Sequence, residues 1–327
     1  MSGRERPMNK IKVLAVVGPT ASGKSDLAVA LCRRFNGEVV SADSMQIYKG
    51  MDIATAKPTA DEMQGICHHM LDFLETDRQY SVAQYQTDAA DCISKICGKG
   101  KLPVVAGGTG LYIDTLLNNV RLSEESFKQD LRSELAQRCK TEGAETLLSE
   151  LAGIDPEYAA KLHPNNEKRI IRALEVWHST GKTVTEQNEA SHRESPYEVL
   201  YIGLDAENRD YLYDRINRRV DLMLENGLEN EAREFFNREN SATSAQAIGY
   251  KELKPYLDGE LSLNEAVENL KRATRRYAKR QLTWFRRNTC INWLYIDKYE
   301  SKERLFDAAF NIAEVFLNGG EMPNEKT

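Results

Sequence analysis

The stretch VVGPTASGKSDLAVAL, residues 16–31, decides the fold of this chain. It contains Gly-x-x-x-x-Gly-Lys-Ser between an apolar run at 11–17 and a run at 25–35 that suits a helix. Such a loop points backbone N–H groups inward, and the positive end of the following helix adds to their attraction for phosphates. Lys24 is expected on the outer phosphates and Ser25 on Mg²⁺. The predicted phosphate-binding residues are Gly18, Pro19, Thr20, Ala21, Ser22, Gly23, Lys24 and Ser25. The loop recognises phosphates alone, so it does not by itself imply a nucleotide.

Short β-branched runs at 11–17, 38–41 and 102–106 have the length and composition of buried parallel strands, and a fourth follows at 199–204. Helical periodicity lies between them, at 82–97 as well as after the phosphate loop. Strands that alternate with helices predict an α/β fold, in which ligands bind beyond the carboxyl ends of the strands. The expected core is therefore a P-loop NTPase-like parallel sheet flanked by helices.

Between about 123 and 196 no strand is convincing. Helices are predicted there at 126–140, 144–151, 156–162 and 166–179, with Gly181 as a stop. We interpret 123–196 as an all-helical insertion domain, and 1–122 with 197–327 as the catalytic core. Further helices are predicted at 210–226, 229–238, 251–257, 263–288 and 302–318.

Composition places the chain among ordinary globular proteins, with 41% hydrophobic and 29% charged residues. No apolar run approaches the roughly 18 residues of a membrane span, and no secretion signal is recognised, so we expect a cytoplasmic protein without a membrane partner. The six cysteines form no Cys-x-x-Cys pair and are expected to be reduced thiols in or near cores. Cys67 beside His68 and His69 is only weak support for a metal site. Three consecutive residues on a strand or turn cannot all face one ion, which argues against such a site.

The net charge of −6 excludes a generic nucleic-acid binder, but the charges are unevenly distributed. Residues 271–287 carry eight basic side chains and no acidic one, with Tyr277, Trp284 and Phe285 among them. A solvated helix face is the alternative interpretation, although such a face usually mixes both signs. The absence of acids and the interleaved aromatic rings favour a surface that binds nucleic acid.

A second polar loop, in EVVSADSMQIYKGMDIATAKP, follows the run at 38–41. Asp43, Ser44, Gln46 and Tyr48 form a polar cluster next to the phosphate loop, which indicates a site for a second substrate. The alternative is that Asp43 and Ser44 cap a helix. Residues alone leave both interpretations open.

A third loop, in LPVVAGGTGLYIDTLL, follows the run at 102–106. Gly107, Gly108 and Gly110 surround Thr109, and we expect these glycines to let the backbone approach a ligand closely. All three loops follow strands of one parallel sheet, so they should converge on one rim.

Eight segments, in order, resemble the tRNA dimethylallyltransferases, also called tRNA isopentenyltransferases. They are GPTASGKS (18–25), SADSMQIYKGMDIATAKP (41–58), HHMLD (68–72), GGTGLY (107–112), KRIIRALEV (168–176), YDRINRRVDLMLENGL (213–228), QAIGYKEL (246–253) and RRYAKRQLTWFRR (275–287). The resemblance implies transfer of a dimethylallyl group from dimethylallyl diphosphate to N6 of the adenosine 3′ of a tRNA anticodon. It also implies a phosphate-loop core with a helical insertion, in the bacterial form without a zinc finger. We expect a monomer that uses Mg²⁺ and binds the anticodon stem-loop.

The resemblance also implies roles for single residues. Asp43 would accept the N6 proton, and Thr109 would help to hold the base or its phosphate. Arg215 and Arg219, four apart on a predicted helix, would clamp the diphosphate, with Arg215 preferred as the nearer; a pair of surface arginines is the alternative. Thr20 would hydrogen-bond the bridging oxygen of the diphosphate.

The expected tRNA contacts lie in the matching segments, except for Arg132, which stands in QDLRSEL. They are Asp43, Ser44, Met45, Gln46, Thr109, Arg132, Lys168, Arg169, Ile170, Ile171, Arg172, Gln246, Ala247, Ile248, Gly249, Tyr250, Arg275, Arg276, Lys279 and Arg280. For Arg132 a surface salt bridge is an equal alternative. Three rival functions are a prenyltransferase of free adenine nucleotides, a small-molecule P-loop kinase, and an RNA-binding adaptor that only retains the fold.

Overall fold

The computed structural model describes residues 10–119, 129–191 and 194–320. Contacts divide the chain into two compact units, each considered by itself below. The first comprises Met1–Asn118 and Ser195–Thr327, and the second comprises Asn119–Glu194. The limits of the second unit differ by a few residues at either end from those expected for the insertion, 123–196.

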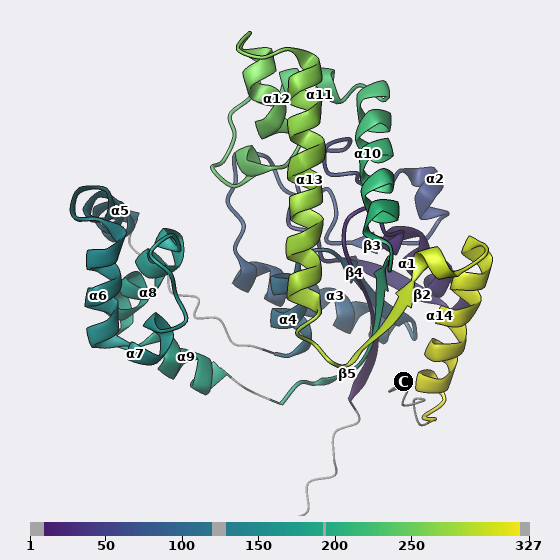
Figure 1. Ribbon diagram of the computed structural model, residues 1–327. Coiled ribbons are helices and arrows are strands. Elements are labelled where there is room, and N and C mark those ends of the chain that lie inside the picture. Colours follow the sequence, from purple (N-terminus) through teal and green to yellow (C-terminus); the bar gives the residue numbers. More distant parts are fainter. Residues whose placement is uncertain (1–9, 120–128, 192–193, 321–327) are drawn as a thin grey trace, which may run out of the picture. The chain divides into compact units, whose positions relative to one another are not determined.

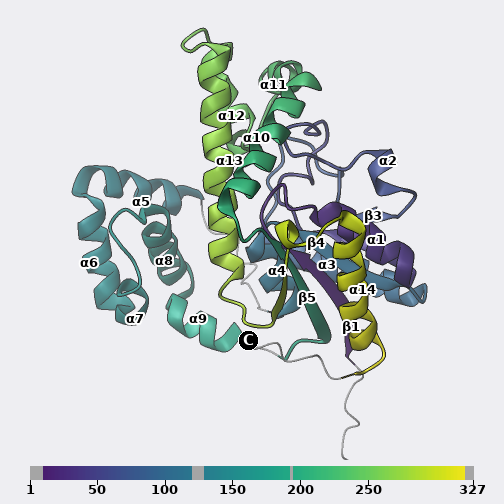
Figure 2. The same ribbon diagram turned by 45° about the vertical axis from the view of Figure 1, so that its right-hand side comes forward.

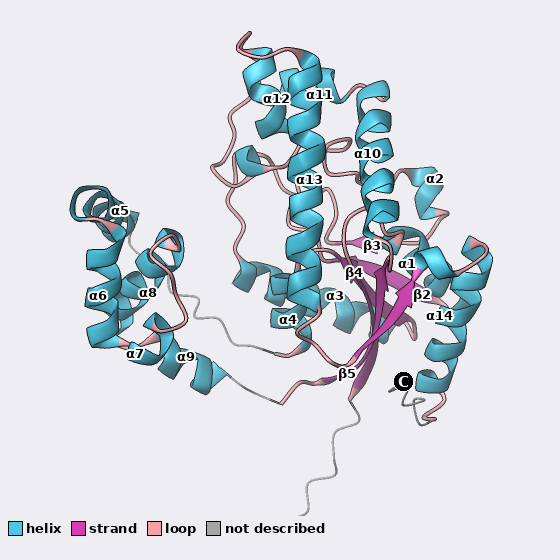
Figure 3. Cartoon of the chain, in the orientation of Figure 1, coloured by secondary structure: helices cyan, strands magenta, loops and turns pink. Residues whose placement is uncertain are grey.

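A six-stranded sheet forms the centre of the first unit (Figure 3). Its strands are β1 (Ile11–Val17), β2 (Gly37–Ser41), β3 (His68–His69), β4 (Leu102–Gly107), β5 (Tyr197–Asp205) and β6 (Ile291–Tyr295). They lie in the order β3-β2-β4-β1-β5-β6, and every pair of neighbours is parallel. The predicted α/β fold with a parallel sheet is therefore confirmed.

Alternate residues of β1 belong to different cores, because successive side chains of a strand point to opposite faces. Leu14 and Val16 pack in the core that includes residues of α1 (Lys24–Phe35) and α14 (Lys302–Leu317). Val13, Ala15 and Val17 pack in the core that includes residues of α3 (Val82–Gly98) and α4 (Gly110–Leu117). All five are fully buried, as expected for a parallel sheet covered by helices on both faces (Figures 1 and 2).

A further group of helices follows β5 and builds a third core. They are α10 (Arg209–Glu225), α11 (Leu228–Phe236), the short helix η1 (Ser244–Gln246), α12 (Tyr250–Leu257) and α13 (Leu263–Phe285). Their apolar side chains bury Ile47, Tyr48 and Met51 from the loop after β2. The long helix α13 packs against α10 and α12 and, near its carboxyl end, against α4 (Figure 1). This packing brings α13 to the rim of the sheet. The short elements α2 (Ala60–Met63) and η2 (Ile296–Lys298) complete the unit.

The second unit is helical throughout its described residues. Its helices are α5 (Gln129–Glu142), α6 (Ala144–Ile154), α7 (Pro156–Ala159), α8 (Glu167–Thr180) and α9 (Val184–Ser191). Leu135, Leu147 and Leu174 belong to its own hydrophobic core. The buried carboxylate of Asp155 accepts hydrogen bonds from the backbone N–H and the hydroxyl of Thr185, which ties α7 to α9.

The sequence analysis predicted α5 to α8 but missed α9, which has only eight residues and little apolar periodicity. The predicted start of the first of these helices, 126–128, lies outside the described residues. Strands β3 and β6 were also missed, since β3 has two residues and β6 follows a long basic helix.

All six cysteines are free thiols. The expectation that they lie in or near cores is wrong for Cys67 and Cys290, which are exposed. No helix among the described residues is long and apolar enough to cross a membrane.

Candidate active site

The phosphate loop, residues 18–25, adopts a conformation that leaves donors without partners. Gly18, Ala21 and Gly23 have φ angles of 141°, 62° and 92°. Gly23 caps the start of α1 without a side-chain hydrogen bond, so the first amides of the helix have no side-chain cap. The hydroxyl of Ser22 is buried and has no hydrogen-bond partner among the described residues. Unpaired donors at a helix N-terminus fit a bound anion such as a diphosphate.

Lys24 folds back over this loop. Its Nζ donates a hydrogen bond of 2.6 Å to the carbonyl oxygen of Pro19. Burial and, to a smaller extent, nearby Arg219 lower the pKa of Lys24 to about 7, against the effect of Asp43, which raises it. A bound polyphosphate would favour the charged form of this lysine, because opposite charges stabilise each other.

Two arginines of α10 reach the same loop, and they lie one helical turn apart. Nη1 of Arg219 donates to Oγ1 of Thr20 at 3.2 Å, and Nε of Arg215 donates to the carbonyl oxygen of Ala21 at 2.8 Å. Arg215 is exposed, whereas Arg219 is partly buried and burial lowers its pKa. Because both side chains bond the phosphate loop, neither is a free surface arginine, which was the alternative interpretation. They share one face of α10, as their spacing predicted.

The three polar loops meet at one cavity of about 310 Å³. Its polar wall includes Thr20, Lys24, Ser25, Asp43, Ser44, Gln46, Gly108, Arg219, Tyr277 and Gln281, and its apolar wall includes Ile216, Val220, Met223 and Leu270. A second cavity, of about 540 Å³, adjoins it and is lined by Arg215, Arg218, Lys57 and Asp52 among others. The two cavities share Lys24, Ser25, Ala56, Arg219 and Met223. The candidate phosphate-binding groups Lys24, Ser25 and Arg219 thus lie where the two cavities meet.

Asp43 starts a turn after β2 and does not cap a helix. Its Oδ1 accepts a hydrogen bond from the backbone N–H of Met45 at 2.9 Å, and residues 44–47 form bends and a turn. The backbone N–H of Ser44 donates to Oγ1 of Thr109 at 3.1 Å. Thr109 therefore fastens the Asp43 turn to the loop after β4, while the carboxylate of Asp43 lines the cavity.

The cavity wall formed by residues 52–56 is held from two sides. Nε2 of Gln46 donates to the carbonyl oxygens of Thr55 and Ala56, each at 3.1 Å. The carboxylate of Glu231, on α11, accepts hydrogen bonds from the backbone N–H groups of residues 52, 53 and 54 at 2.7–2.9 Å. It also accepts one from the hydroxyl of Tyr250 at 2.8 Å. This wall is preformed without a ligand.

The glycines after β4 allow close packing of the protein around them. A Cβ atom on Gly107 would lie 2.2 Å from the carbonyl oxygen of Ala42. On Gly108 it would lie 2.1 Å from Nε2 of Gln281, and on Gly110 it would lie 2.2 Å from the ring of Trp284. These glycines therefore allow Ala42, Gln281 and Trp284 to approach the loop closely. Gly107 and Gly108 also line the cavity, so close access for a ligand stays a prediction.

Two side chains of α13 that line the cavity were not singled out as site residues. Gln281 is 5% exposed and hydrogen-bonds both the phosphate loop and the loop after β4. Burial raises the pKa of Tyr277, against hydrogen bonds with Thr109 and Gln281 that lower it, so its hydroxyl stays protonated at neutral pH. Residues 277, 281 and 284 are spaced four and three apart, so they lie on one face of α13. This spacing is the feature of the sequence that could have indicated that the face is buried.

The cations expected to bind RNA fall into two groups. Arg276, Lys279 and Arg280 on α13 are exposed and form no ion pair among the described residues. The same holds in the second unit for Lys168 and Arg169 on α8. Arg275, by contrast, donates to Oδ1 of Asn217 at 2.6 Å.

Other residues expected to contact RNA have side chains that are buried in the protein or paired with a carboxylate. Ile170, Ala247 and Tyr250 are 0–2% exposed in apolar cores, and Gly249 is buried, which limits contact there to the backbone. Arg132 forms an ion pair of 2.8 Å with the buried Glu175, which Arg172 also contacts. The salt bridge weighed as an alternative for Arg132 is thus present. Met45, Ile171, Gln246 and Ile248 are at least partly exposed.

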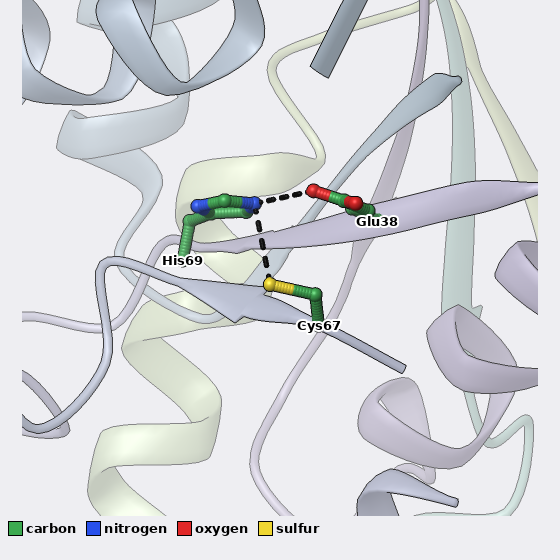
Figure 4. Close-up of side chains that lie close together, drawn as sticks. All are labelled: Glu38, Cys67 and His69. Carbon is green, nitrogen blue, oxygen red and sulfur yellow. Dashed lines mark hydrogen bonds and ion pairs between the residues drawn. The ribbon is translucent and has the colours of Figure 1, made fainter. Parts of the chain in front are cut away.

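A cluster of Glu38, Cys67 and His69 lies where β2 pairs with the edge strand β3. Cys67 immediately precedes β3, and His69 lies two residues later, so both side chains face the same side. There Nε2 of His69 contacts Oε2 of Glu38 at 2.7 Å and Sγ of Cys67 at 3.6 Å (Figure 4). Lys99 and Lys101 also hold this carboxylate, at 3.0 and 2.8 Å. Burial would raise the pKa of Glu38, but hydrogen bonds from Lys101, His69 and Lys99 lower it to about 2. Two ammonium groups on the carboxylate repel a dication, so the cluster is an ion-paired one.

Comparison with known proteins agrees with this geometry. The sequence model of the family described as IPP transferase matches residues 46–288. A tRNA dimethylallyltransferase of Caldanaerobacter subterraneus is 48% identical over 92% of this chain and 96% of its own length, and that of Bacillus subtilis is 47% identical over 88% and 92%.

Solved structures are similar as well. A tRNA isopentenylpyrophosphate transferase of Bacillus halodurans is 44% identical with a TM-score of 0.70, covering 94% of this chain and 98% of its own. A eukaryotic dimethylallyltransferase acting on tRNA is 30% identical with a TM-score of 0.83, covering 97% and 82%. With a family match over most of its length and relatives nearly half identical throughout, this chain belongs to the IPP transferase family.

Proposed function

We propose that this chain transfers a dimethylallyl group from dimethylallyl diphosphate to N6 of the adenosine on the 3′ side of the tRNA anticodon, releasing diphosphate. The names of the relatives support a prenyl transfer to tRNA. The observation that carries the chemistry is one cavity in which the carboxylate of Asp43, the phosphate-binding Lys24 and Ser25, and an aliphatic wall occur together.

The aliphatic wall distinguishes this site from that of a kinase. Ile216, Val220, Met223 and Leu270 stand beside the phosphate loop, where they would bury a short branched hydrocarbon. A ribose at this place would need polar partners for its hydroxyl groups. The wall therefore favours an isoprenoid diphosphate over a nucleotide as the occupant of the loop.

Cleavage of the allylic C–O bond builds negative charge on the leaving diphosphate. The backbone N–H groups at the start of α1, the ammonium of Lys24 and the guanidinium of Arg219 are placed around this charge, with Arg215 at the outer cavity. Donors fixed before the reaction stabilise developing charge without reorganising, which lowers the barrier. Thr20 accepts from Arg219 and keeps its hydroxyl hydrogen for an oxygen of the diphosphate.

The N6 amino group is a weak nucleophile, because its lone pair is delocalised into the ring. Asp43 would accept a hydrogen bond from N6–H and take the proton as the new C–N bond forms. Within the described part of the chain, only one of its carboxylate oxygens accepts a hydrogen bond, from the backbone N–H of Met45. The hydroxyl of Thr109 keeps the turn of Asp43 in place through Ser44.

Mg²⁺ fits the donors of this site. Ser25 is exposed and lines both cavities, and oxygen ligands from a hydroxyl and from phosphates are those that Mg²⁺ prefers. When bound there, the ion would neutralise charge on the diphosphate. We propose Ser25 as its protein ligand.

The adenosine must leave its stack to reach an enclosed cavity, so we expect base flipping. The exposed cations Arg276, Lys279 and Arg280 of α13, and Lys168 and Arg169 of the second unit, would contact the phosphates of the anticodon stem-loop, which is recognised largely by shape and backbone. We also propose that the protein acts in the cytoplasm as a monomer.

The proposal is tested with labelled dimethylallyl diphosphate, Mg²⁺ and unmodified tRNA, with AMP and ATP in parallel. We expect label in tRNA adenosine and a loss of about 10²–10⁴-fold in rate for Asp43→Asn, the usual contribution of a general base. Asp88→Asn, on the exposed side of α3, is the matched control. Label only in free nucleotide would refute the tRNA substrate, and consumption of ATP without transfer would refute the prenyl chemistry.

A further inference from the structure

Gln281 uses both ends of its side-chain amide to join two loops of the active site. Its Oε1 accepts a hydrogen bond of 2.8 Å from the backbone N–H of Thr20, in the phosphate loop. Its Nε2 donates a hydrogen bond of 3.0 Å to the carbonyl oxygen of Gly108, after β4. The side chain is 5% exposed, and a Cβ on Gly108 would overlap it. The bridge is therefore built into the packing of α13.

The peptide group between Pro19 and Thr20 is fixed at both ends by this arrangement. Its N–H is bonded to Gln281, and its carbonyl oxygen accepts the hydrogen bond from Nζ of Lys24. Because a peptide group is planar, the orientation of its N–H sets the direction of its carbonyl group. Gln281 thus determines where the carbonyl that holds Lys24 points.

Gln281 also stands next to the cations that face outward from α13. Arg280 precedes it and lines the same cavity, while Arg276 and Lys279 are exposed. Within a helix these backbone positions are rigidly connected over so short a distance. A ligand that restrains this part of α13 therefore acts, through the amide of Gln281, on the phosphate loop.

We propose that Gln281 is a positioning residue that orients the Pro19–Thr20 peptide, and with it Lys24, and that it couples RNA bound on α13 to diphosphate bound in the loop. The coupling rests on the proposed function, since it requires RNA on α13; the positioning of Lys24 does not. Coupling between two bound ligands is reciprocal, so it can be measured from either one.

The test titrates magnesium diphosphate into the protein by calorimetry, with and without an anticodon stem-loop RNA. For Gln281→Met, which has a similar length and neither hydrogen bond, we expect diphosphate to bind about tenfold more weakly, the effect of losing one or two hydrogen bonds. RNA should strengthen diphosphate binding by the wild type but not by Gln281→Met. The KM for dimethylallyl diphosphate should rise in this variant, whereas the affinity for tRNA measured without diphosphate should stay within about twofold.

Gln281→Glu gives a readout that a merely structural role would not produce. An ionised carboxylate keeps the acceptor for Thr20 but loses the donor to Gly108, whereas a protonated carboxyl group restores both. Relative to wild type at each pH, the affinity of this variant for diphosphate should therefore improve as the pH falls. Thr283→Ala, an exposed position on α13 whose hydroxyl bonds only the helix backbone, is the matched control.

Diphosphate affinity like that of the wild type in a folded Gln281→Met protein would overturn the proposal. So would equal losses of affinity for tRNA alone and for diphosphate alone, or a Gln281→Glu profile parallel to that of the wild type. A wild type that binds diphosphate but labels no tRNA would contradict the proposed function instead, and the diphosphate titration without RNA would still decide the role of Gln281.

Discussion

Nη1 of Arg219 lies 3.2 Å from Oγ1 of Thr20, so α10 touches the phosphate loop through a guanidinium that has no carboxylate partner among the described residues. Burial lowers the pKa of this arginine. A partly buried cation with no carboxylate in ion-pair contact is favoured by the binding of an anion. This relationship supports the proposal that Arg219 binds the diphosphate.

Comparison of Arg219→Met with Arg215→Met ranks the two arginines. We expect Arg219→Met to weaken diphosphate binding by about 10–100-fold, because a charge-assisted hydrogen bond is lost in an enclosed place. Arg215→Met should cost less, since Arg215 is exposed and lies at the outer cavity only. Isothermal titration with magnesium diphosphate measures both. A larger loss for Arg215→Met would support the preference drawn from the sequence and contradict the ranking by burial.

The protonation of Lys24 makes the stability of the ligand-free protein depend on pH. In the unfolded chain this lysine keeps its proton to about pH 10.5, whereas burial in the folded chain lowers its pKa to about 7. Between these values the unfolded state binds more protons, so the free energy of unfolding rises with pH; below about pH 7 both states are protonated and the contribution is flat.

We therefore expect the stability of wild type minus that of Lys24→Met to increase between about pH 7 and about pH 9. Urea unfolding at several pH values measures this difference, with Lys140→Met, an exposed lysine of α5, as the control. Diphosphate should abolish the slope, because it favours the ammonium form. A difference that is constant over this range would show that Lys24 keeps its ordinary pKa in the folded chain.

Glu231 stabilises the cavity wall by accepting four hydrogen bonds, three of them from consecutive backbone N–H groups. Glu231→Gln puts amide hydrogens against those donors, and we expect a loss of about 2–3 kcal/mol in the free energy of unfolding. Glu234→Gln, at an exposed position of the same helix, should change it by less than about 0.5 kcal/mol. Chemical denaturation gives both values, and equal effects would refute this role of Glu231.

The phosphate loop and four strands could be predicted because their signals are local. The run 11–17 is continuous and β-branched, and the loop after it has a fixed glycine spacing. The residues that form the strand and the loop are therefore the same residues that identify them in the sequence. The strand at 291–295 carries a weaker signal, since its burial depends on β5, nearly a hundred residues away. A strand of two residues, such as His68–His69, has no periodicity at all.

The loop residues that line the cavity and the two arginines of α10 were named from the sequence, whereas Gln281 and Tyr277 of α13 were missed. Asp43 and Lys24 follow strands, and the carboxyl ends of parallel strands meet at one edge, so their convergence follows from topology. Gln281 and Tyr277 lie in a run whose charge dominates its composition, and only packing shows which face of α13 turns inward. The glycines after β4 were predicted to allow a close approach; at Gly108 and Gly110 the approaching group is a helix of the chain itself, and at Gly107 it is the backbone of Ala42.

The exposed cations of α13 should determine how strongly salt weakens the binding of tRNA. Each phosphate contact releases counterions, so the logarithm of affinity falls with the logarithm of salt concentration by about 0.7–0.9 per contact. For Arg276→Ala and Lys279→Ala we expect the slope to become shallower by about one such contact each. Arg304→Ala, an exposed arginine at the start of α14, should leave it unchanged. Filter binding of unmodified tRNA over a range of salt concentrations gives the slopes. Unchanged slopes for the α13 variants, or an equal change for Arg304→Ala, would place the tRNA backbone on another surface of the protein.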